Sequence, residues 1–253
     1  MMELLLGMDD TDVLGHKPGT GRLARDLGAH LEEQRLARLV GVVRHQLLVD
    51  PRIPYTSHNS PACVVLAIDD CTDGFTRRLF QEAASYILSR CARGSDPGLC
   101  LADKTKVGEA VVHFGWRASS EVVPKADALE LGQRHDLLLE ELGGTGDGVI
   151  GALAAVGLTA EGNGGRFLEL NGGLRDFGQR VAARLLRERG ITLLSISRNG
   201  EVVPTDAVIA TGDWLRPRLV GGHPVLFVEQ TEDGWCCFDR KKRHADADHE
   251  ESM

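Results

Sequence analysis

Three carboxylates lie within four residues near the start of the chain, at Asp9, Asp10 and Asp12, and the hydroxyl of Thr11 lies between them. They directly follow an apolar segment that ends at Met8. If the chain turns after Met8, all three carboxylates and the hydroxyl can converge on one Mg²⁺ ion, which prefers oxygen ligands and shares its remaining positions with water and phosphate. The alternative is a solvated turn in which one Asp caps backbone amides. The spacing alone leaves both interpretations open.

A threonine flanked by two glycines follows this acidic segment. Thr20 lies between Gly19 and Gly21, where a helix is expected to begin, so its hydroxyl would lie next to the positive end of that helix. Lys17 adds a cation that could face a phosphate. We therefore take Thr11, Lys17 and the two glycines as candidates for nucleotide binding, and Thr20 as a candidate catalytic residue. An ordinary N-cap threonine would show the same pattern.

A glycine-rich segment, GGTGDGVIGALAAVG at 143–157, precedes a second expected helix. Gly144, Gly146 and Gly148 would let backbone amides approach an anion closely, and the helix dipole favours negative charge there. The segment matches neither the dinucleotide fingerprint nor the Walker P-loop. The alternative is a tight turn followed by small residues for close helix packing. Asp147 favours this alternative, because a carboxylate repels phosphate.

The segment PRIPYTSHNSPA at 51–62 is predicted to be a loop, because it contains three prolines. Its polar side chains make it a candidate substrate-binding loop, although an inert surface loop would look similar. The candidate residues in it are Arg52, Tyr55, Thr56, His58 and Asn59. A later segment, SDPG at 95–98, is a turn signature.

Composition limits the function classes. The chain has 253 residues, 42% of them hydrophobic, which is enough for two compact units. Its net charge of −8 argues against broad, non-specific nucleic-acid binding. No apolar stretch predicts a membrane span or a signal peptide, so we expect a soluble cytoplasmic protein. The six cysteines form no CxxC pair and are expected to be free thiols: Cys63, Cys71, Cys91, Cys100, Cys236 and Cys237.

The first half of the chain predicts the order β-α-β-β-α-β. This is the ferredoxin-like arrangement, which places both helices on one face of an antiparallel sheet. The periodicity predicts strands over 2–8, 38–49, 63–68 and 99–102 and helices from 21 onward and over 75–91.

The second half predicts a further α+β unit. We expect helices over 125–142, from the glycine-rich segment onward and over 174–188, and strands over 167–170, 191–196, 207–212 and 223–229. The predicted fold class is therefore α+β, with two units that are both ferredoxin-like or related antiparallel sheets covered by helices on one face. The expected boundaries are 1–120, 121–237 and a mobile charged tail at 238–253.

Five motifs, taken in order, resemble the archaeal tRNA 2-agmatinylcytidine synthetases, and the resemblance extends from Leu5 to about Glu229. They are GMDDTD, the Gly/Thr loop, IPYTSHN, SDPG and GTGDGVIGALAAVG. In that family a kinase-like domain uses ATP and Mg²⁺ to phosphorylate a cytidine in the anticodon loop, and agmatine then displaces the phosphate. A ferredoxin-like domain follows. The resemblance implies that Asp9, Asp10 and Asp12 handle the metal and phosphates, that Thr20 lies at or beside an autophosphorylated threonine, and that Arg52, Tyr55 and Asn59 lie in a loop similar to IPxKTRGNG.

The chain also departs from the family pattern. The family carries an OB-fold and a zinc ribbon that help to grip tRNA, and this chain is expected to lack both. KPGTGRL stands where the family usually has a Cys-Thr-Thr run, Asp147 stands where a basic residue is usual, and TSHNS lacks a basic residue. Each change removes positive charge or contact area that a tRNA substrate would use.

The sequence thus predicts an enzyme, a Mg²⁺- and ATP-dependent phosphotransferase or ligase-like protein related to tRNA processing. Its acceptor would be an RNA nucleoside or a small amine-containing metabolite. The alternative is a non-catalytic nucleotide- or metal-binding module that works with a partner protein. A homodimer is compatible with either hypothesis.

Overall fold

The computed structural model describes all residues except 16–17, 55–57, 70–71, 172, 198–200 and 239–253. It divides into two compact units. Unit 1 comprises Met1–Gly172 and Arg218–Gly222, and unit 2 comprises Gly173–Pro217 and His223–Met253. The division therefore falls near residue 172, whereas the sequence predicts it at residue 120. The reason is that elements after residue 120 pair with strands of the first half and pack against them.

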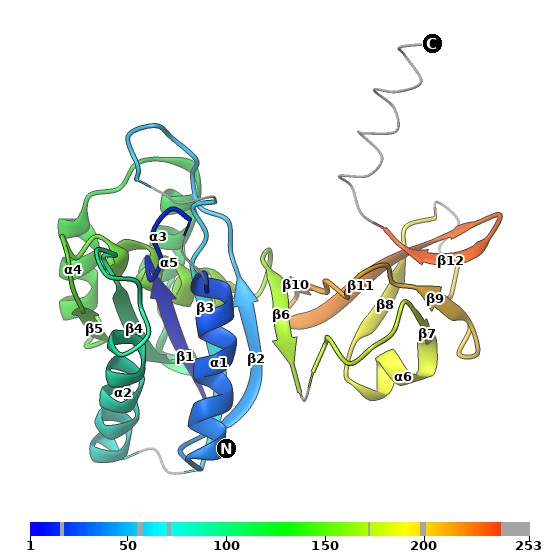
Figure 1. Cartoon of the computed structure of the whole chain (residues 1–253), viewed down its shortest axis with the longest axis horizontal. Coiled ribbons are helices and arrows are strands. Elements are labelled where there is room, and N and C mark those ends of the chain that lie inside the picture. The colour runs from blue at the N-terminus through cyan, green and yellow to red at the C-terminus, as the bar shows by residue number, and fades with distance from the viewer. Residues whose placement is uncertain (16–17, 55–57, 70–71, 172, 198–200, 239–253) are drawn as a thin grey trace. The chain divides into compact units, whose positions relative to one another are not determined.

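The strands of unit 1 are ordered β5-β4-β1-β3-β2-β6-β10, and every neighbouring pair is antiparallel (Figure 1). The first six elements follow the predicted order β-α-β-β-α-β. The strand bounds are β1 Met2–Asp9, β2 Arg38–Arg44, β3 Ala62–Ile68, β4 Gly98–Asp103, β5 Leu138–Glu141, β6 Arg166–Leu170 and β10 Arg218–Val220.

Helices cover both faces of this sheet, and Figure 1 shows α1 and α2 on one face and α5 with α3 on the other. The bounds are α1 Thr20–Glu33, α2 Asp73–Leu88, α3 Glu109–Ser120, α4 Lys125–Arg134 and α5 Gly148–Glu161, with a short 3₁₀ turn η1 at Lys104–Lys106. Alternation along β1 explains the two faces. Leu4, Leu6 and Met8 belong to the core cluster shared with α1 and α2, whereas Gly7 lies against α5.

Glycines allow α5 to approach the sheet and α3 closely. A Cβ atom on Gly7 would collide with the carbonyl oxygen of Ala152, and one on Gly98 would collide with the backbone of Gly148. On the other side of α5, a Cβ on Gly157 would collide with the carbonyl oxygen of Val111. Nearly every residue of α5 from Gly148 to Thr159 is buried. The small residues after the glycine-rich loop therefore serve close helix packing, which was one of the two predicted roles.

The helix predicted over 125–142 is wrong in its second half. Helix α4 ends at Arg134, Asp136 adopts a left-handed conformation with φ 50°, and 138–141 form β5, which pairs with β4. The passage before α4 contains α3, a helix that the sequence analysis did not predict. The buried residues of α3 nevertheless show helical spacing: Val111, Phe114, Gly115 and Ala118.

Unit 2 contains a mixed sheet in the order β8-β11-β12-β9-β7, in which β8 is parallel to β11 and β9 is parallel to β12. Its bounds are β7 Arg180–Ala182, α6 Ala183–Glu188, β8 Thr192–Ser195, β9 Val208–Ala210, β11 His223–Thr231 and β12 Gly234–Cys237. This arrangement differs from the expected second βαββαβ unit, because the helices expected there belong to unit 1. The helix expected over 174–188 is limited to α6, because 180–182 pair with β9 instead.

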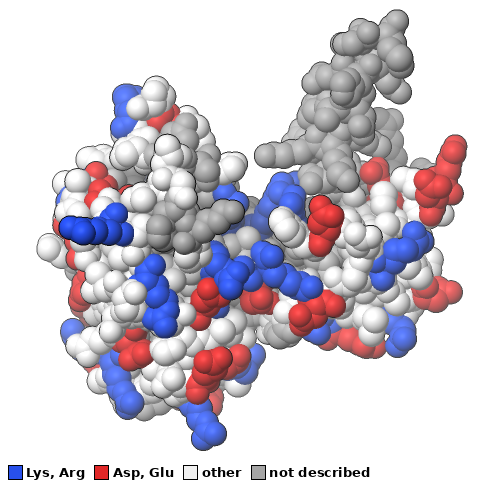
Figure 2. All heavy atoms as spheres, in the orientation of Figure 1, with Lys and Arg blue, Asp and Glu red and all other residues white. Residues whose placement is uncertain are grey.

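The α+β class is thus confirmed. On the face that Figure 2 shows, Lys and Arg side chains are interspersed with Asp and Glu side chains over each unit. In the part of the chain that the structure describes, no helix combines the length and the apolar character that crossing a membrane requires.

Because one histidine is buried, we expect the free energy of unfolding to depend on pH. His45 is only 3% exposed, its Nε2 lies 2.8 Å from the Thr159 hydroxyl, and burial lowers its pKa to about 4. The unfolded chain protonates this residue near pH 6.5, whereas the folded protein keeps it neutral until about pH 4. The stability that neutral His45 contributes is therefore lost as the pH falls from 6.5 toward 4.

We expect this contribution to fall by roughly 2 to 3 kcal/mol between pH 7.5 and pH 4.5. The measurement is the difference in unfolding free energy between wild type and His45→Gln at the two pH values, by urea denaturation. Because wild type and variant are compared at the same pH, the effects of the other titrating groups cancel. The Gln side chain can still form a hydrogen bond with Thr159. A difference that does not change with pH would contradict the prediction.

Candidate functional site

The acidic segment forms a sharp turn at the end of β1. Asp9 is the last residue of this strand, and Asp10 adopts the left-handed conformation with φ 52°, which Asp tolerates better than most residues. The backbone N–H of Asp10 donates a hydrogen bond to the Asp9 carboxylate. We call residues 9–12 the acidic turn.

Two buried threonines join the acidic turn to the start of α1. The hydroxyl of Thr11 donates to the hydroxyl of Thr20 at 3.0 Å, and the two residues are 1% and 7% exposed. The Thr11 carbonyl accepts a hydrogen bond from the N–H of Ala92 at 2.9 Å. The Thr20 hydroxyl thus lies in the position that the sequence predicts, but it is buried and bonded.

The third carboxylate of the turn lies beside the first turn of α1. A Cβ atom on Gly19 would lie 2.8 Å from an Asp12 carboxylate oxygen, and Gly19 is the N-cap of α1. This places Asp12 close to the positive end of the helix dipole. Gly21 has a packing role instead, since its Cβ would lie 2.8 Å from Leu168 on β6. Lys17 lies outside the described residues.

The glycine-rich loop approaches the acidic turn through the start of α5. Gly144 and Gly146 have φ of 61° and 77°, a conformation that favours glycine. Helix α5 begins at Gly148, and its N-cap Asp147 makes no side-chain capping bond. One turn later, Gly151 lies directly against the Asp9 carboxylate, because a Cβ there would overlap it. The first turn of α5 is therefore in contact with the acidic turn.

Two amides of the glycine-rich loop bond within the protein. The N–H of Gly146 donates to the carbonyl of Gly143 at 3.1 Å, and the N–H of Gly148 donates to the carbonyl of Asp96 at 3.2 Å. In one of the two interpretations that the sequence left open, these amides would face an anion. In the structure they stabilise the turn that precedes α5, and the dipole of α5 remains as the feature that favours negative charge.

Asp96 is a member of this site that the sequence interpretation missed, because it treated SDPG only as a turn. Its backbone N–H bonds to the Asp10 carboxylate. Its own carboxylate accepts hydrogen bonds from the N–H and the hydroxyl of Thr145, at 3.0 and 2.6 Å. The sequence signal for Asp96 was the position of SDPG at the start of a core strand. In the sheet, the start of this strand lies beside the end of β1.

The carboxylates of this site influence one another. The pKa of Asp9 is raised to about 7, chiefly by burial and to a smaller extent by the charges of Asp10 and Asp12, while the bond from the Asp10 N–H lowers it. Burial also raises the pKa of Asp10 to about 6, with Asp96, Asp12 and Asp147 contributing in that order. The carboxylates thus concentrate negative charge that favours a cation, and the two helix starts beside them favour an anion.

The side chains as they lie do not enclose a metal ion. In the described ranges, no three His, Cys, Asp or Glu side chains are arranged so that they could hold one. The carboxylates of the acidic turn therefore lie near one another, but in this structure the three of them do not surround a single metal position as the sequence analysis predicted.

The candidate substrate loop makes local bonds in the structure. The guanidinium of Arg52 is exposed and donates two hydrogen bonds of 2.8 Å to Asp50, which lower the pKa of that carboxyl to about 2. The Asn59 amide donates to the carbonyl of Leu48 at 2.8 Å, which closes the loop. His58 is exposed. Tyr55 and Thr56 lie outside the described residues, and these bonds of Arg52 and Asn59 stay within or beside the loop.

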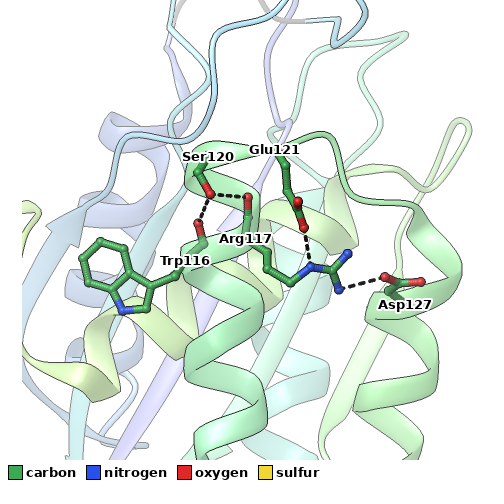
Figure 3. Close-up of polar contacts among 5 residues, drawn as sticks. All are labelled: Trp116, Arg117, Ser120, Glu121 and Asp127. Carbon is green, nitrogen blue, oxygen red and sulfur yellow. Dashed lines mark hydrogen bonds and ion pairs between the residues drawn. The ribbon is translucent and has the colours of Figure 1, made fainter.

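A concave region lies away from the acidic turn, between α3 and α4, with a volume of about 240 Å³. Arg117 donates hydrogen bonds to Glu121 at 2.5 Å and to Asp127 at 3.0 Å. Figure 3 shows that Trp116 points away from these carboxylates. The second arginine of this region, Arg134, is paired with Glu130. Both arginines are thus paired with carboxylates, and the pair of Arg117 with Asp127 joins the two helices, whereas the pair of Arg134 with Glu130 lies within α4.

Known structures share this fold, although no protein-family model and no curated protein matches the chain. The crystal structure of TiaS with an isoleucine tRNA and ATP matches with a TM-score of 0.53 and 24% identity, over 62% of this chain and 36% of TiaS. The complex of TiaS with the same tRNA, AMPCPP and agmatine gives 0.51 and 23%, over the same shares. This chain has a TiaS-like fold. A tRNA fluorescent labelling enzyme gives 0.50 and 24%, over 62% of this chain and 36% of that enzyme.

The family resemblance inferred from the sequence is thereby confirmed at the level of the fold, since TiaS is a tRNA agmatidine synthetase. The matched region spans about a third of the length of the TiaS structures.

Proposed function

We propose that unit 1 is a Mg²⁺- and ATP-dependent phosphotransferase or ligase-like domain that acts on an RNA nucleoside or a small amine. The observation that carries this proposal is the meeting of the acidic turn with the starts of α1 and α5. Helix starts favour phosphate through their dipoles and backbone N–H groups, and carboxylates hold the cation that accompanies it. Phosphoryl transfer needs little more than such positioning and charge stabilisation.

The donor chemistry of the acidic turn fits Mg²⁺. Asp9 and Asp10 provide hard oxygen donors, and a nearby cation would favour their ionised forms over the protonated ones that burial favours. Because no three His, Cys, Asp or Glu side chains among the described residues are arranged around one ion, one or two carboxylates would hold it, and water and phosphate oxygens would supply the remaining ligands. Bound Mg²⁺ would neutralise charge on the transferred phosphoryl group.

The other residues of the site act on the phosphates or hold the site together. The amides at the start of α1 would orient phosphate oxygens, while the glycine-rich loop would act through the dipole of α5. Thr20 holds the start of α1 against the acidic turn through Thr11. Phosphorylation of Thr20, which the resemblance implies, would first require this buried hydrogen bond to open.

The ligands of TiaS support the choice of substrates. TiaS has been crystallised with ATP and a tRNA, and with AMPCPP and agmatine. By analogy, ATP would be the phosphoryl donor here, and an RNA nucleoside or an amine would be the acceptor. Such a reaction belongs in the cytoplasm, where ATP and tRNA occur together.

One observation favours a second candidate function, a non-catalytic module that binds nucleotide or metal beside a partner protein. The carboxylates lie close together but do not assemble a complete metal site in the described residues. A partner could supply what is absent.

Turnover separates the two functions. We would incubate the purified protein with Mg²⁺ and ATP, with and without bulk tRNA and agmatine, and follow the nucleotide products and the intact protein mass. Release of ADP or AMP above an EDTA control is the expected result. Nucleotide binding without any product would favour the module, and the absence of both would contradict the proposed function.

A further inference from the structure

We propose that Asp96 is a positioning residue that fixes the glycine-rich loop against the acidic turn. Its effect on ATP rests on the proposed function, whereas its effect on the loop does not. The sequence analysis assigned Asp96 only to a turn, and SDPG has the composition of an ordinary one.

All three polar groups of Asp96 connect parts of the site that are far apart in the sequence. Its N–H bonds to the Asp10 carboxylate, 86 residues before it. Its carboxylate accepts from the N–H and hydroxyl of Thr145, and its carbonyl accepts from the N–H of Gly148 at 3.2 Å. A residue that only forms a turn would bond within two or three positions of itself, so these contacts indicate a role in joining the two segments.

The loop conformation depends on the same side chain. Gly144 packs so closely on the Asp96 carboxylate that any Cβ atom there would overlap it, and its φ of 61° favours glycine. The neighbouring Pro97 accepts a hydrogen bond from Leu142 at 2.8 Å, which secures the other end of the loop. The Asp96 carboxylate therefore determines how the backbone between Thr145 and Gly148 leads into α5.

The chain contains a matched control at the opposite end of the same strand. Asp103 is the last residue of β4, whereas Asp96 lies just before the first residue of that strand. The Asp103 carboxylate accepts hydrogen bonds from the N–H and the hydroxyl of Thr105, at 2.9 and 2.8 Å. This is the same pair of bonds, but between residues two positions apart. Asp103→Ala thus removes equivalent hydrogen bonds without touching the glycine-rich loop.

The test compares Asp96→Ala, Asp96→Asn and Asp103→Ala in the full chain by amide hydrogen exchange and by the Kd for ATP with Mg²⁺. Asp96→Ala should speed exchange over 143–148 and weaken ATP binding, each by about tenfold, as expected for the loss of charge-assisted bonds. Asp96→Asn keeps an acceptor for the Thr145 N–H and should recover part of both effects. Asp103→Ala should leave both measurements within about twofold of wild type, because it makes no contact with the site.

Each outcome decides one claim. Unchanged exchange over 143–148 in Asp96→Ala overturns the positioning role, as does wild-type ATP affinity in that variant. If wild type itself binds no ATP, the proposed function fails, while the exchange result still decides the role of Asp96. Should Asp96→Ala not fold, Thr145→Ala and Thr145→Ser give the same comparison, because only the serine keeps the hydroxyl that bonds to Asp96.

Discussion

Asp9→Asn is expected to abolish ATP turnover while making the folded protein more stable. The Asp9 carboxylate is partly buried and lies directly against Gly151, and an amide of nearly the same shape fits there. Asn carries no charge for Mg²⁺, and we expect turnover to fall on the order of 10³-fold, as when a principal electrostatic group is removed. Product formation from ATP, measured against wild type, checks this.

The stability gain follows from the pKa of Asp9. This pKa is about 7 in the folded protein against an ordinary value of 3.8, so ionisation of Asp9 opposes folding progressively as the pH rises from about 4 to 7. Asn cannot ionise, and in EDTA the variant should be more stable by roughly 2 to 4 kcal/mol at about pH 8, with the difference vanishing below about pH 4. Urea denaturation at both pH values measures it.

Asp26→Asn provides the control for this variant. Asp26 lies in α1 and forms an exposed ion pair with Arg22, so its loss should change neither turnover nor stability appreciably. Retained turnover in Asp9→Asn would remove Asp9 from the proposed mechanism. If Asp9→Asn is instead less stable than wild type at alkaline pH, the charge of the Asp9 carboxylate must already be compensated in the folded protein.

Gly98→Ala is expected to destabilise unit 1 by roughly 3 kcal/mol, the upper end of the usual cost of overpacking. A Cβ atom on Gly98 would overlap the backbone of Gly148 and Val149. No side-chain rotation can relieve this contact, so the start of α5 must move away from β4. The same movement would separate the glycine-rich loop from the acidic turn, and ATP binding should weaken together with stability.

Gly74→Ala is the matched control, since Gly74 lies in α2 and a Cβ there would meet nothing within 4 Å. Alanine is the better helix former, so this variant should be stabilised by about 0.5 kcal/mol. Thermal and urea unfolding of both variants provide the measurement. A Gly98→Ala protein as stable as wild type would mean that α5 does not pack on β4 as closely as the structure indicates.

The sequence predicts the first six elements well because local patterns determine them. Strand β1 is an apolar run ended by charged residues, and α1 has its buried leucines at 23, 27 and 31, one helical turn apart. Strand β5 could not be predicted in this way. Its leucines continue the apolar pattern of α4, and only pairing with β4, which lies far earlier in the chain, makes 138–141 a strand.

The candidate site was predictable in part. The turn at Asp9 and Asp10, the place of Thr20 at the start of α1 and the glycine-rich start of α5 all follow from residue type and spacing. The bonds from Asp96 to Asp10 and Thr145 depend on the antiparallel pairing of β1 with β4, which no local pattern encodes. The pairing of Arg52 with Asp50 is local, because the two opposite charges lie two residues apart in the sequence.

The most direct test of the account is the binding of AMPCPP, a non-hydrolysable ATP analogue, measured by isothermal titration calorimetry with Mg²⁺ and again with EDTA. We predict that wild type and Asp26→Asn bind the analogue at least about tenfold more tightly with Mg²⁺, and that Asp9→Asn loses this difference. Equal binding by wild type with and without Mg²⁺, or an unchanged Mg²⁺ effect in Asp9→Asn, would contradict a magnesium–nucleotide site at the acidic turn.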